Sequence, residues 1–543
     1  MNRKFLDKAN VLLSGEKGTV FKDPGGRINI ALCYPNSYSV GMSSLGFQGI
    51  YGFLNSLPDV VCERVFFPDE DDLEDFVRSR TEPFSLESKR PLSAFDIAAF
   101  SVSFENDYPH LVRMLQLAHI PARSAEREGH HPLIIMGGVC AFYNPEPLAD
   151  FMDVIFVGEA EEMLEEFLAA YRSETGREKL LRQASGIEGV YIPSWYTVEY
   201  GADGKIAART AAAGAPEMIR KRSIRDISKS FLRSSVLTPA AEFSDMYLIE
   251  AMRGCPWSCR FCVAGHIYRP VRKKDLAQLR EEVSEAAAKG WKVGLIGPSL
   301  SDYPHAEEVL GMEGVDFSIT SLRANAKSGR MVQLMKGHRS ISIAPEAGTQ
   351  RLRNVINKKI SDDDIYETAR TILESGVDTL RLYFMIGLPT ERAEDIEGLI
   401  DVVKTIRRNT RRGYIRLTVS TFVPKPFTPF QWHPMEPLKS IKEKLRTIKK
   451  GLAQEKGVRV FHDVPKHAHL QGLFARGDRR TGRIIERLAE NDTDMLKDGS
   501  PDMDIGSVIF RQWDLAEVLP WDFIDAGVGK EHLWSEYRKA LDA

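Results

Sequence analysis

Three of the six cysteines in this chain of 543 residues lie within one short run, at Cys255, Cys259 and Cys262. The C-x3-C-x2-C spacing directs three thiolates toward one point. A [4Fe–4S] cluster normally takes four cysteine ligands, and no cysteine follows Cys262 in the sequence. A cluster bound by this run would therefore keep one iron free for a small molecule.

Two simpler interpretations compete with a cluster. The three cysteines could form a zinc site completed by His266, or they could be buried structural thiols. Zinc sites favour paired C-x2–4-C elements separated by a longer loop, and this run has no such pair of elements. We therefore predict that Cys255, Cys259 and Cys262 are cluster ligands.

The composition is that of an ordinary soluble protein, with 43% hydrophobic and 27% charged residues. The formal charge of −3 provides no overall field that would attract nucleic acid or a membrane surface. We find no signal peptide and no apolar run of about 18 residues that could span a membrane. Few cysteines and an oxygen-sensitive cluster predict a reducing, cytoplasmic location.

The periodicity predicts an α/β protein with several domains. Residues 1–190 alternate short apolar runs with amphipathic stretches, which is typical of a parallel sheet flanked by helices. The predicted strands are 28–34, 96–103, 133–136 and 154–157, and a helix is expected at 43–54. Ligands of such sheets bind at the carboxyl ends of the strands, so the turns at 35–39, 101–103 and 137–140 should line one crevice.

Residues 191–245 are predicted to be a connector, and a second alternation of strands and helices occupies 246–436. Its strand candidates are 247–250, 292–296, 317–322, 340–344, 379–386 and 415–423, and its helix candidates are 275–288, 327–335, 361–375 and 393–409. The active site of such an arrangement is expected at the carboxyl ends of the strands. Residues 437–543 are predicted to form a small α+β cap.

The cysteine run resembles the cluster loop of the radical S-adenosylmethionine (SAM) superfamily. That resemblance implies a partial (β/α)6 barrel over 246–436, with the cluster in its first loop. It also implies that the free iron binds the amine and carboxylate of SAM. A reduced cluster, supplied by an electron donor such as flavodoxin or ferredoxin, would then cleave SAM to a 5′-deoxyadenosyl radical.

The same resemblance assigns further SAM-binding residues. Phe261, before the last cysteine, would pack near the adenine, and Arg323 would bind the carboxylate. Glu346 would accept the ribose hydroxyls, with a structural salt bridge as the alternative. A Gly-Gly-Glu-like turn that holds the SAM amine in many members is replaced here by Gly297-Pro298-Ser299, which leaves Gly297 and Ser299 as substitutes. Ile386 and Gly387 match a turn against which the adenine packs.

The layout of the first 190 residues resembles the Rossmann-like cobalamin (B12)-binding domain of one radical SAM subclass. Ser101, Ser103, Gly137 and Gly138 stand where such domains contact the corrin and its nucleotide tail. The chain has no Asp-x-His-x-x-Gly motif that would supply an axial histidine, so a vestigial or substrate-docking domain is the alternative. The segments 38–43, 144–148, 422–432 and 476–480 are similar to an uncharacterised bacterial family of this subclass.

Three functions follow from these patterns. The first is cobalamin-dependent methyl transfer to an unknown substrate, which could be RNA, a peptide or a small molecule. The second is RNA or ribosome modification of the methylthiotransferase type, in which Cys33, Cys62 and Cys140 would hold a second cluster. The third is a non-catalytic iron–sulfur redox sensor. His462, His467 and His469 are predicted to be surface or hydrogen-bonded histidines rather than a metal site.

Overall fold

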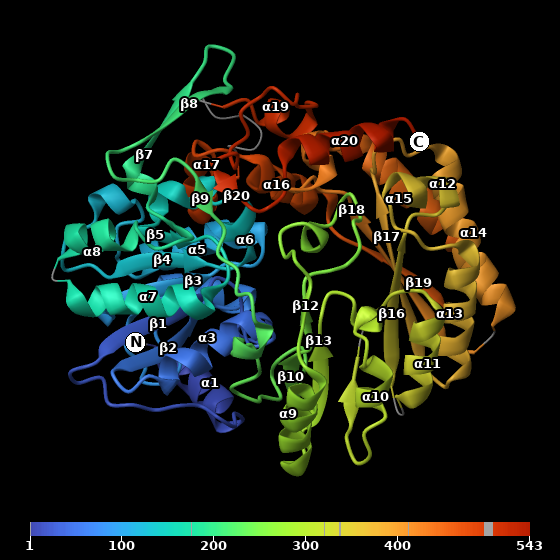
Figure 1. The fold of residues 1–543 in the computed structure, drawn as a ribbon, viewed down its shortest axis with the longest axis horizontal. Helices are drawn as coiled ribbons and strands as arrows, with labels where there is room; N and C mark the ends of the chain where they lie inside the picture. The colour runs from blue at the N-terminus through green and yellow to red at the C-terminus, as the bar shows by residue number, and fades with distance from the viewer. Residues whose placement is uncertain (1, 175, 320, 336–337, 411, 494–502) are drawn as a thin grey trace. The chain divides into compact units, whose positions relative to one another are not determined.

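The computed structural model describes residues 2–174, 176–319, 321–335, 338–410, 412–493 and 503–543. The protein is a mixed α/β structure with parallel sheets, and it divides into two compact units (Figure 1). The first unit contains Met1–Leu248, Gly477–Ile505 and Glu517–Gly527. The second contains Ile249–Arg476, Gly506–Ala516 and Val528–Ala543. Residues 437–543, expected to be one cap, are thus distributed over both units.

The first unit is built on a six-stranded sheet in the order β2-β1-β3-β4-β5-β6. The strands are β1 (Ile28–Tyr34), β2 (Val60–Phe66), β3 (Ile97–Ser101), β4 (Leu133–Gly137), β5 (Val154–Phe156) and β6 (Val190–Tyr191). Strands β1 to β5 are parallel, and β6 is antiparallel to β5. The four predicted strands of this region correspond to β1, β3, β4 and β5, whereas β2 was not predicted.

One face of this sheet shares a core with four helices. They are α1 (Arg3–Ser14), α3 (Leu45–Ser56), α7 (Ala160–Ser173) and α8 (Arg177–Ala184), and α7 and α8 run alongside the sheet in Figure 1. The predicted helix at 43–54 is α3, which begins where Ser44 caps the backbone N–H of Phe47. Two further helices, α5 (Tyr108–Leu117) and α17 (Thr481–Ala489), pack against each other.

Strand β2 carries a buried charge. The Arg64 guanidinium is almost fully inaccessible and lies 2.7 Å from the carboxylates of both Glu16 and Glu87. The charged pair Glu63-Arg64 interrupts the apolar pattern of β2, and partners distant in sequence make the burial of Arg64 tolerable.

Replacing Arg64 with leucine is expected to lower the free energy of unfolding by roughly 3–5 kcal/mol, because two buried carboxylates lose their common partner. Urea unfolding followed by circular dichroism measures the effect. Arg78→Leu is the matched control, since Arg78 is an exposed arginine on α4 (Glu70–Arg78) and pairs only at the surface. Equal midpoints for the two variants would contradict the expectation.

The second unit contains two larger sheets, in the orders β10-β13-β14 and β15-β16-β17-β18-β19, and a two-stranded sheet of β11 (Met252–Arg253) and β12 (Arg272–Lys273). The strands of the first are β10 (Met246–Glu250), of which Ile249 and Glu250 belong to this unit, β13 (Lys292–Ile296) and β14 (Phe317–Ser318). Those of the second, all parallel, are β15 (Ser321–Leu322), β16 (Ser340–Glu346), β17 (Thr379–Ile386), β18 (Tyr414–Thr421) and β19 (Val458–His462). Strand β19, from the segment expected to be a cap, is therefore the edge strand of this sheet.

Helices alternate with these strands, close to the predicted positions. They are α9 (Leu276–Ala288), α11 (Ala326–Leu334), α13 (Asp362–Glu374) and α14 (Ala393–Asn409), followed by α15 (Leu438–Leu452). Helix α13 begins with a capping box between Ser361 and Asp364. Within the described residues, no helix is long and apolar enough to cross a bilayer.

Candidate functional site

The three clustered cysteines lie in the loop between β11 (Met252–Arg253) and β12 (Arg272–Lys273). All three are free thiols; Cys259 is buried, and Cys255 and Cys262 are partly exposed. Gly254 begins the loop at a φ of +83°, and a Cβ at this position would lie 2.3 Å from the Tyr268 carbonyl oxygen. Only glycine fits this close turn, which directs the chain into the cysteine run.

The three thiols are close enough to influence one another. Burial, together with the neighbouring Cys259 and Cys255, raises the pKa of Cys262 to about 11. Burial and Cys259 also raise the pKa of Cys255. Among the described residues, no three His, Cys, Asp or Glu side chains are grouped so that they could hold one metal ion. Three free thiols in one loop supply the number of cysteine ligands that a cluster with one free iron would need.

Neighbouring segments anchor the loop. Arg260 donates to the Val355 carbonyl oxygen at 2.8 Å and to the Glu536 carboxylate at 3.0 Å. Asn357 donates to the Ser258 carbonyl oxygen at 2.8 Å. His266 places Nε2 3.3 Å from the Cys259 carbonyl oxygen, and burial lowers its pKa to about 4. His266 thus places one ring nitrogen against the backbone of the loop.

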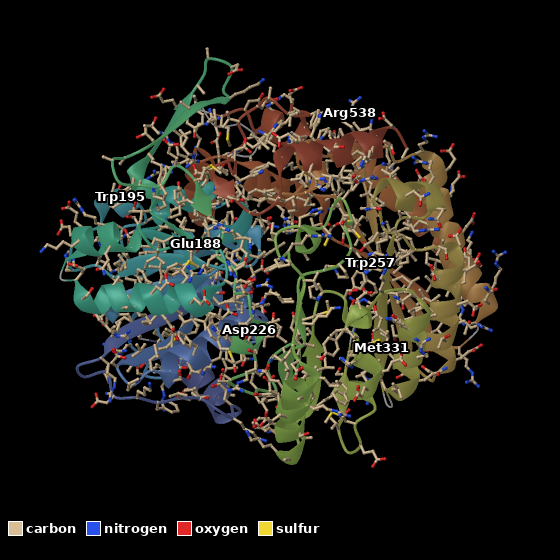
Figure 2. The ribbon with its side chains drawn as sticks, viewed as in Figure 1. Glu188, Trp195, Asp226, Trp257, Met331 and Arg538 are labelled. Carbon is tan, nitrogen blue, oxygen red and sulfur yellow. The ribbon has the colours of Figure 1, made fainter. Side chains whose placement is uncertain are left out.

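Trp257, inside the cysteine run and labelled in Figure 2, connects two predicted residues to the loop. Its indole N–H donates to Asp302 at 2.6 Å, and Asp302 also accepts from the Ser299 hydroxyl at 2.7 Å. The Arg323 guanidinium lies 3.7 Å from the centroid of a Trp257 ring. The structure therefore brings Ser299 and Arg323 to the cysteine loop. Trp257 and Asp302 were not predicted, although Trp257 is visible between the first two cysteines.

Lys358 is a second unpredicted residue of the site. Its ammonium group lies 3.0 Å from Glu346 and 5.9 Å from the centroid of the Phe261 ring. Burial alone would lower the pKa of Lys358, but the negative charges of Glu346 and Cys259 raise it. Arg323 donates to the Lys359 carbonyl oxygen at 3.0 Å. Phe261, Arg323 and Glu346 therefore all contact the segment of Lys358 and Lys359, which lies beside Cys259. One carboxylate oxygen of Glu346 thus forms a salt bridge with Lys358. A structural salt bridge was the alternative to ribose binding for this residue.

Glu346 also has an unusual backbone. It ends β16 at a φ of +69°, after a shift in the pairing register with β17. Non-glycine residues in the left-handed region are strained, and such strain is concentrated at functional sites.

The other predicted SAM contacts have local structural reasons. A Cβ on Gly297 would lie 2.5 Å from the Met252 side chain, next to the cysteine loop. Gly387 has a φ of +80°, and its N–H donates to Glu391 at 3.1 Å. Ile386 is fully buried. The turn after β17 is therefore closed by its own glutamate, and an adenine contact there stays a prediction.

In the first unit, Ser101, Gly137 and Gly138 line one apolar cavity of about 60 Å³. Side chains of α3 and α7 form its opposite wall. Gly138 has a φ of +101°, and a Cβ there would lie 2.4 Å from the Val102 carbonyl oxygen. Gly137 has more space, because the nearest atom to its Cβ would be Phe156 Cβ at 3.9 Å. Ser103 is exposed and is not among the residues that line this cavity.

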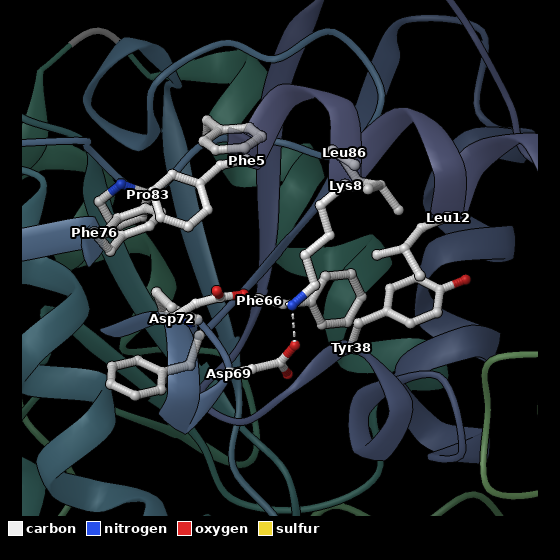
Figure 3. A pocket seen from close by; sticks show the side chains of 14 residues that line it. Phe5, Lys8, Leu12, Tyr38, Phe66, Asp69, Asp72, Phe76, Pro83 and Leu86 are labelled. Carbon is white, nitrogen blue, oxygen red and sulfur yellow. Dashed lines mark hydrogen bonds and ion pairs between the residues drawn. The ribbon is translucent and has the colours of Figure 1, made fainter. Parts of the chain in front are cut away.

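A second cavity of the first unit, of about 100 Å³, lies under α1 (Figure 3). It is lined mainly by apolar side chains, several of them aromatic, and Lys8 pairs there with Asp69 and Asp72. None of the predicted site residues lines it.

Cys33, Cys62 and Cys140 do not face one point. Cys62 is in register with Ile30 and belongs to the same core as α3. Cys33 lies three positions after Ile30 on β1, so its side chain faces the other side of the sheet. Cys140 lies in α6 (Val139–Tyr143), where its sulfur is 3.4 Å from the Tyr143 hydroxyl.

Two of the three clustered histidines of the tail, His462 and His469, have close polar contacts. His462 contacts Lys449 at 2.7 Å, and His469 contacts the Glu436 carbonyl oxygen at 3.0 Å.

Family comparisons match both units. Residues 46–193 match the family described as radical SAM proteins, N-terminal, and residues 249–403 match the radical SAM superfamily.

Individual relatives extend these matches. An uncharacterised protein of Methanocaldococcus jannaschii is 28% identical over 479 residues, which cover 86% of this chain and 93% of that protein. A tRNA-2-methylthio-N(6)-dimethylallyladenosine synthase of Thermodesulfovibrio yellowstonii is 25% identical over 175 residues, or 29% of this chain and 40% of that enzyme. Among solved structures, the cobalamin-dependent SAM radical enzyme OxsB, with aqua-cobalamin and SAM bound, has 13% identity and a TM-score of 0.44. That alignment covers 91% of this chain and 60% of OxsB.

Proposed function

Because this chain belongs to the radical SAM superfamily and is a radical SAM enzyme, we propose that it is a cobalamin-dependent methyltransferase. The family implies a [4Fe–4S] cluster and SAM. The observation that carries the proposal is the anchored cysteine loop, with three interacting thiols and with Arg323 and Glu346 beside it. When bound, the cluster supplies the electron that cleaves SAM, and cobalamin carries the methyl group.

In this proposal Cys255, Cys259 and Cys262 bind the cluster as thiolates. Burial raises the pKa of Cys262 to about 11, so cluster assembly must displace its proton from sulfur. The ammonium group of Lys358 lies close enough to Cys259 for the two groups to interact electrostatically.

SAM would lie against the same loop. Arg323 stacks on Trp257, which holds the guanidinium plane and leaves further N–H groups for the SAM carboxylate. Glu346 uses Oε1 for Lys358, and its second oxygen would accept a ribose hydroxyl. Phe261 would pack near the adenine.

Two features of the first unit support cobalamin binding. The strand order β2-β1-β3-β4-β5 reverses between β1 and β3, because β2 lies on one side of β1 and β3 to β5 lie on the other. Rossmann-like sheets bind ligands at the carboxyl ends of the strands beside such a reversal. The cavity lined by Ser101, Gly137 and Gly138 lies at that end and has apolar walls suited to an aromatic nucleotide base.

We further propose that the second unit is a partial (β/α)6 barrel, since its parallel strands alternate with helices. We infer a reducing, cytoplasmic location and a reduced flavodoxin or ferredoxin as electron donor. The methylthiotransferase alternative is supported by relatives such as the Thermodesulfovibrio enzyme. The positions of Cys33 and Cys62 on opposite faces of the sheet argue against the second cluster that this alternative requires.

The test is anaerobic reconstitution of the full chain with iron, sulfide and cobalamin, followed by chemical reduction. We expect about four irons per chain, one bound cobalamin, and conversion of SAM to 5′-deoxyadenosine. About eight irons would support the methylthiotransferase alternative instead. A protein that cleaves SAM and binds no cobalamin would reject the cobalamin half of the proposal.

A further inference from the structure

The sheet β15 to β19 of the second unit has two different faces. On β17, Leu380 and every second residue after it are buried, whereas Arg381 and Tyr383 are partly exposed. Strand β18 follows the same alternation, with an exposed Arg416. On the edge strand β19, Arg459 and Phe461 are exposed.

Three arginines are direct neighbours on this more accessible face. Arg381 is in register with Arg416, and Arg416 is in register with Arg459. Neighbouring strands lie about 4.8 Å apart, so the three Cα atoms span roughly 10 Å. Residues in register point to the same face, and like charges directly opposite each other destabilise a sheet. This row therefore brings together three positive charges at a cost in stability.

No ion pair joins Arg381, Arg416 or Arg459 to a described carboxylate, and the Nε of Arg381 is buried without a hydrogen-bond partner. Arg416 stacks on Phe461, with its guanidinium 4.0 Å from the ring centroid. Stacking of this kind orients a guanidinium and leaves its N–H edge available.

We propose that the arginine row of Arg381, Arg416 and Arg459 binds the diphosphate group of the substrate. This inference rests on the proposed function and specifies the substrate class, a diphosphate ester. Arginine binds phosphate oxygens through paired hydrogen bonds, and a diphosphate carries two to three negative charges that neighbouring guanidinium groups can share.

The position of the row sets the size of this substrate. Arg381 lies five residues before Ile386, the last residue of β17, and parallel strands rise about 3.3 Å per residue. The row is therefore roughly 16 Å from the carboxyl end of the strand, where the active site is expected. A nucleoside diphosphate or a lipid diphosphate could extend over this distance.

The binding test uses the full reconstituted chain and inorganic pyrophosphate, measured by calorimetry. Arg416→Gln and Arg459→Gln are each expected to weaken pyrophosphate binding about tenfold or more, because each removes a charge-assisted contact. Arg408→Gln is the matched control on α14 and is expected to change binding less than twofold. Equal binding by the wild type and both row variants would overturn the proposal.

A second measurement separates binding from folding. Without ligand, Arg459→Gln is expected to be at least as stable to heat as the wild type, because it relieves repulsion within the row. With pyrophosphate present, the wild type should gain more thermal stability than the variant. The proposal would be overturned if Arg459→Gln were less stable than the wild type without ligand and gained as much thermal stability from pyrophosphate as the wild type does. Arg459 would then have a structural role.

Further ligands distinguish the source of the diphosphate. Tighter binding of a nucleoside diphosphate than of pyrophosphate would support a nucleotide substrate, and tighter binding of a prenyl diphosphate would support a lipid. Binding of an RNA oligonucleotide without any binding of pyrophosphate would overturn the diphosphate assignment. Wild-type SAM cleavage is measured separately, so its failure would reject the proposed function, and a lack of pyrophosphate binding alone would reject only the arginine row.

Discussion

Replacing Cys259 with alanine is expected to lower bound iron from about four atoms per chain to nearly none and to abolish SAM cleavage. Cys259 is the most buried of the three clustered thiols and interacts electrostatically with both others. Two remaining thiolates cannot hold a cluster that already lacks a fourth protein ligand. Iron analysis, the visible absorption of the reconstituted protein and chromatography of 5′-deoxyadenosine measure the three consequences.

Cys140→Ala is the matched control for this change. Cys140 is also a buried free cysteine, but it lies in the first unit beside Tyr143. We expect the Cys140→Ala variant to retain all of its iron and to be only slightly less stable than the wild type. If it lost about half of the iron, a second cluster would be present. If Cys259→Ala retained its iron and SAM cleavage, the cysteine loop would not be the cluster site.

Thermal unfolding distinguishes loss of the cluster from loss of the fold. The loop is anchored by Arg260 and Asn357, whose contacts do not involve the Cys259 side chain. The apo form of Cys259→Ala should therefore unfold at nearly the same temperature as wild-type apo protein.

The parallel strands of the first unit could be predicted because most of them are continuous apolar runs, as is typical of strands buried on both faces. Strand β2 could not, because Glu63 and Arg64 interrupt its apolar pattern. The burial of Arg64 depends on Glu16 and Glu87, whose positions are known only once the chain is folded. Periodicity reports local burial and contains no information on such distant partners.

Prediction of the candidate functional site from the sequence has the same limit. The cysteines were predictable from their spacing, and Ser299 and Arg323 were identified by resemblance. Trp257 and Asp302 were not, because their hydrogen bond joins two segments that are separated in sequence by α9 and two strands. Lys358 follows a short helix and has no motif of its own, so only its proximity to Glu346 identifies it.

The second large effect is expected in the first unit, where Gly137→Leu should weaken cobalamin binding about 100-fold. The new side chain would enter the cavity lined by Ser101 and Gly138, which we propose for the nucleotide base. Burying roughly 100 Å² of aromatic surface contributes about 2.5 kcal/mol, close to the 2.7 kcal/mol that corresponds to a factor of about 100. Binding is measured from cobalt per chain after dialysis and from the absorption of added aquacobalamin.

Gly137 suits this test better than its neighbour Gly138. A Cβ on Gly137 would have no neighbour closer than 3.9 Å, so the fold should tolerate a side chain that fills the cavity. Gly138 has a positive φ and lies against the Val102 backbone, so any substitution there would destabilise the first unit and could not isolate binding.

Gly129→Leu is the matched control, because a Cβ on Gly129 would meet nothing within 4 Å and the residue does not line the cavity. It should bind cobalamin as the wild type does. Wild-type affinity in Gly137→Leu would mean that the base lies elsewhere. An absence of cobalamin binding in all three proteins would instead favour a domain that docks substrate, and the apolar cavity between the sheet and α7 would then be only a space left by packing.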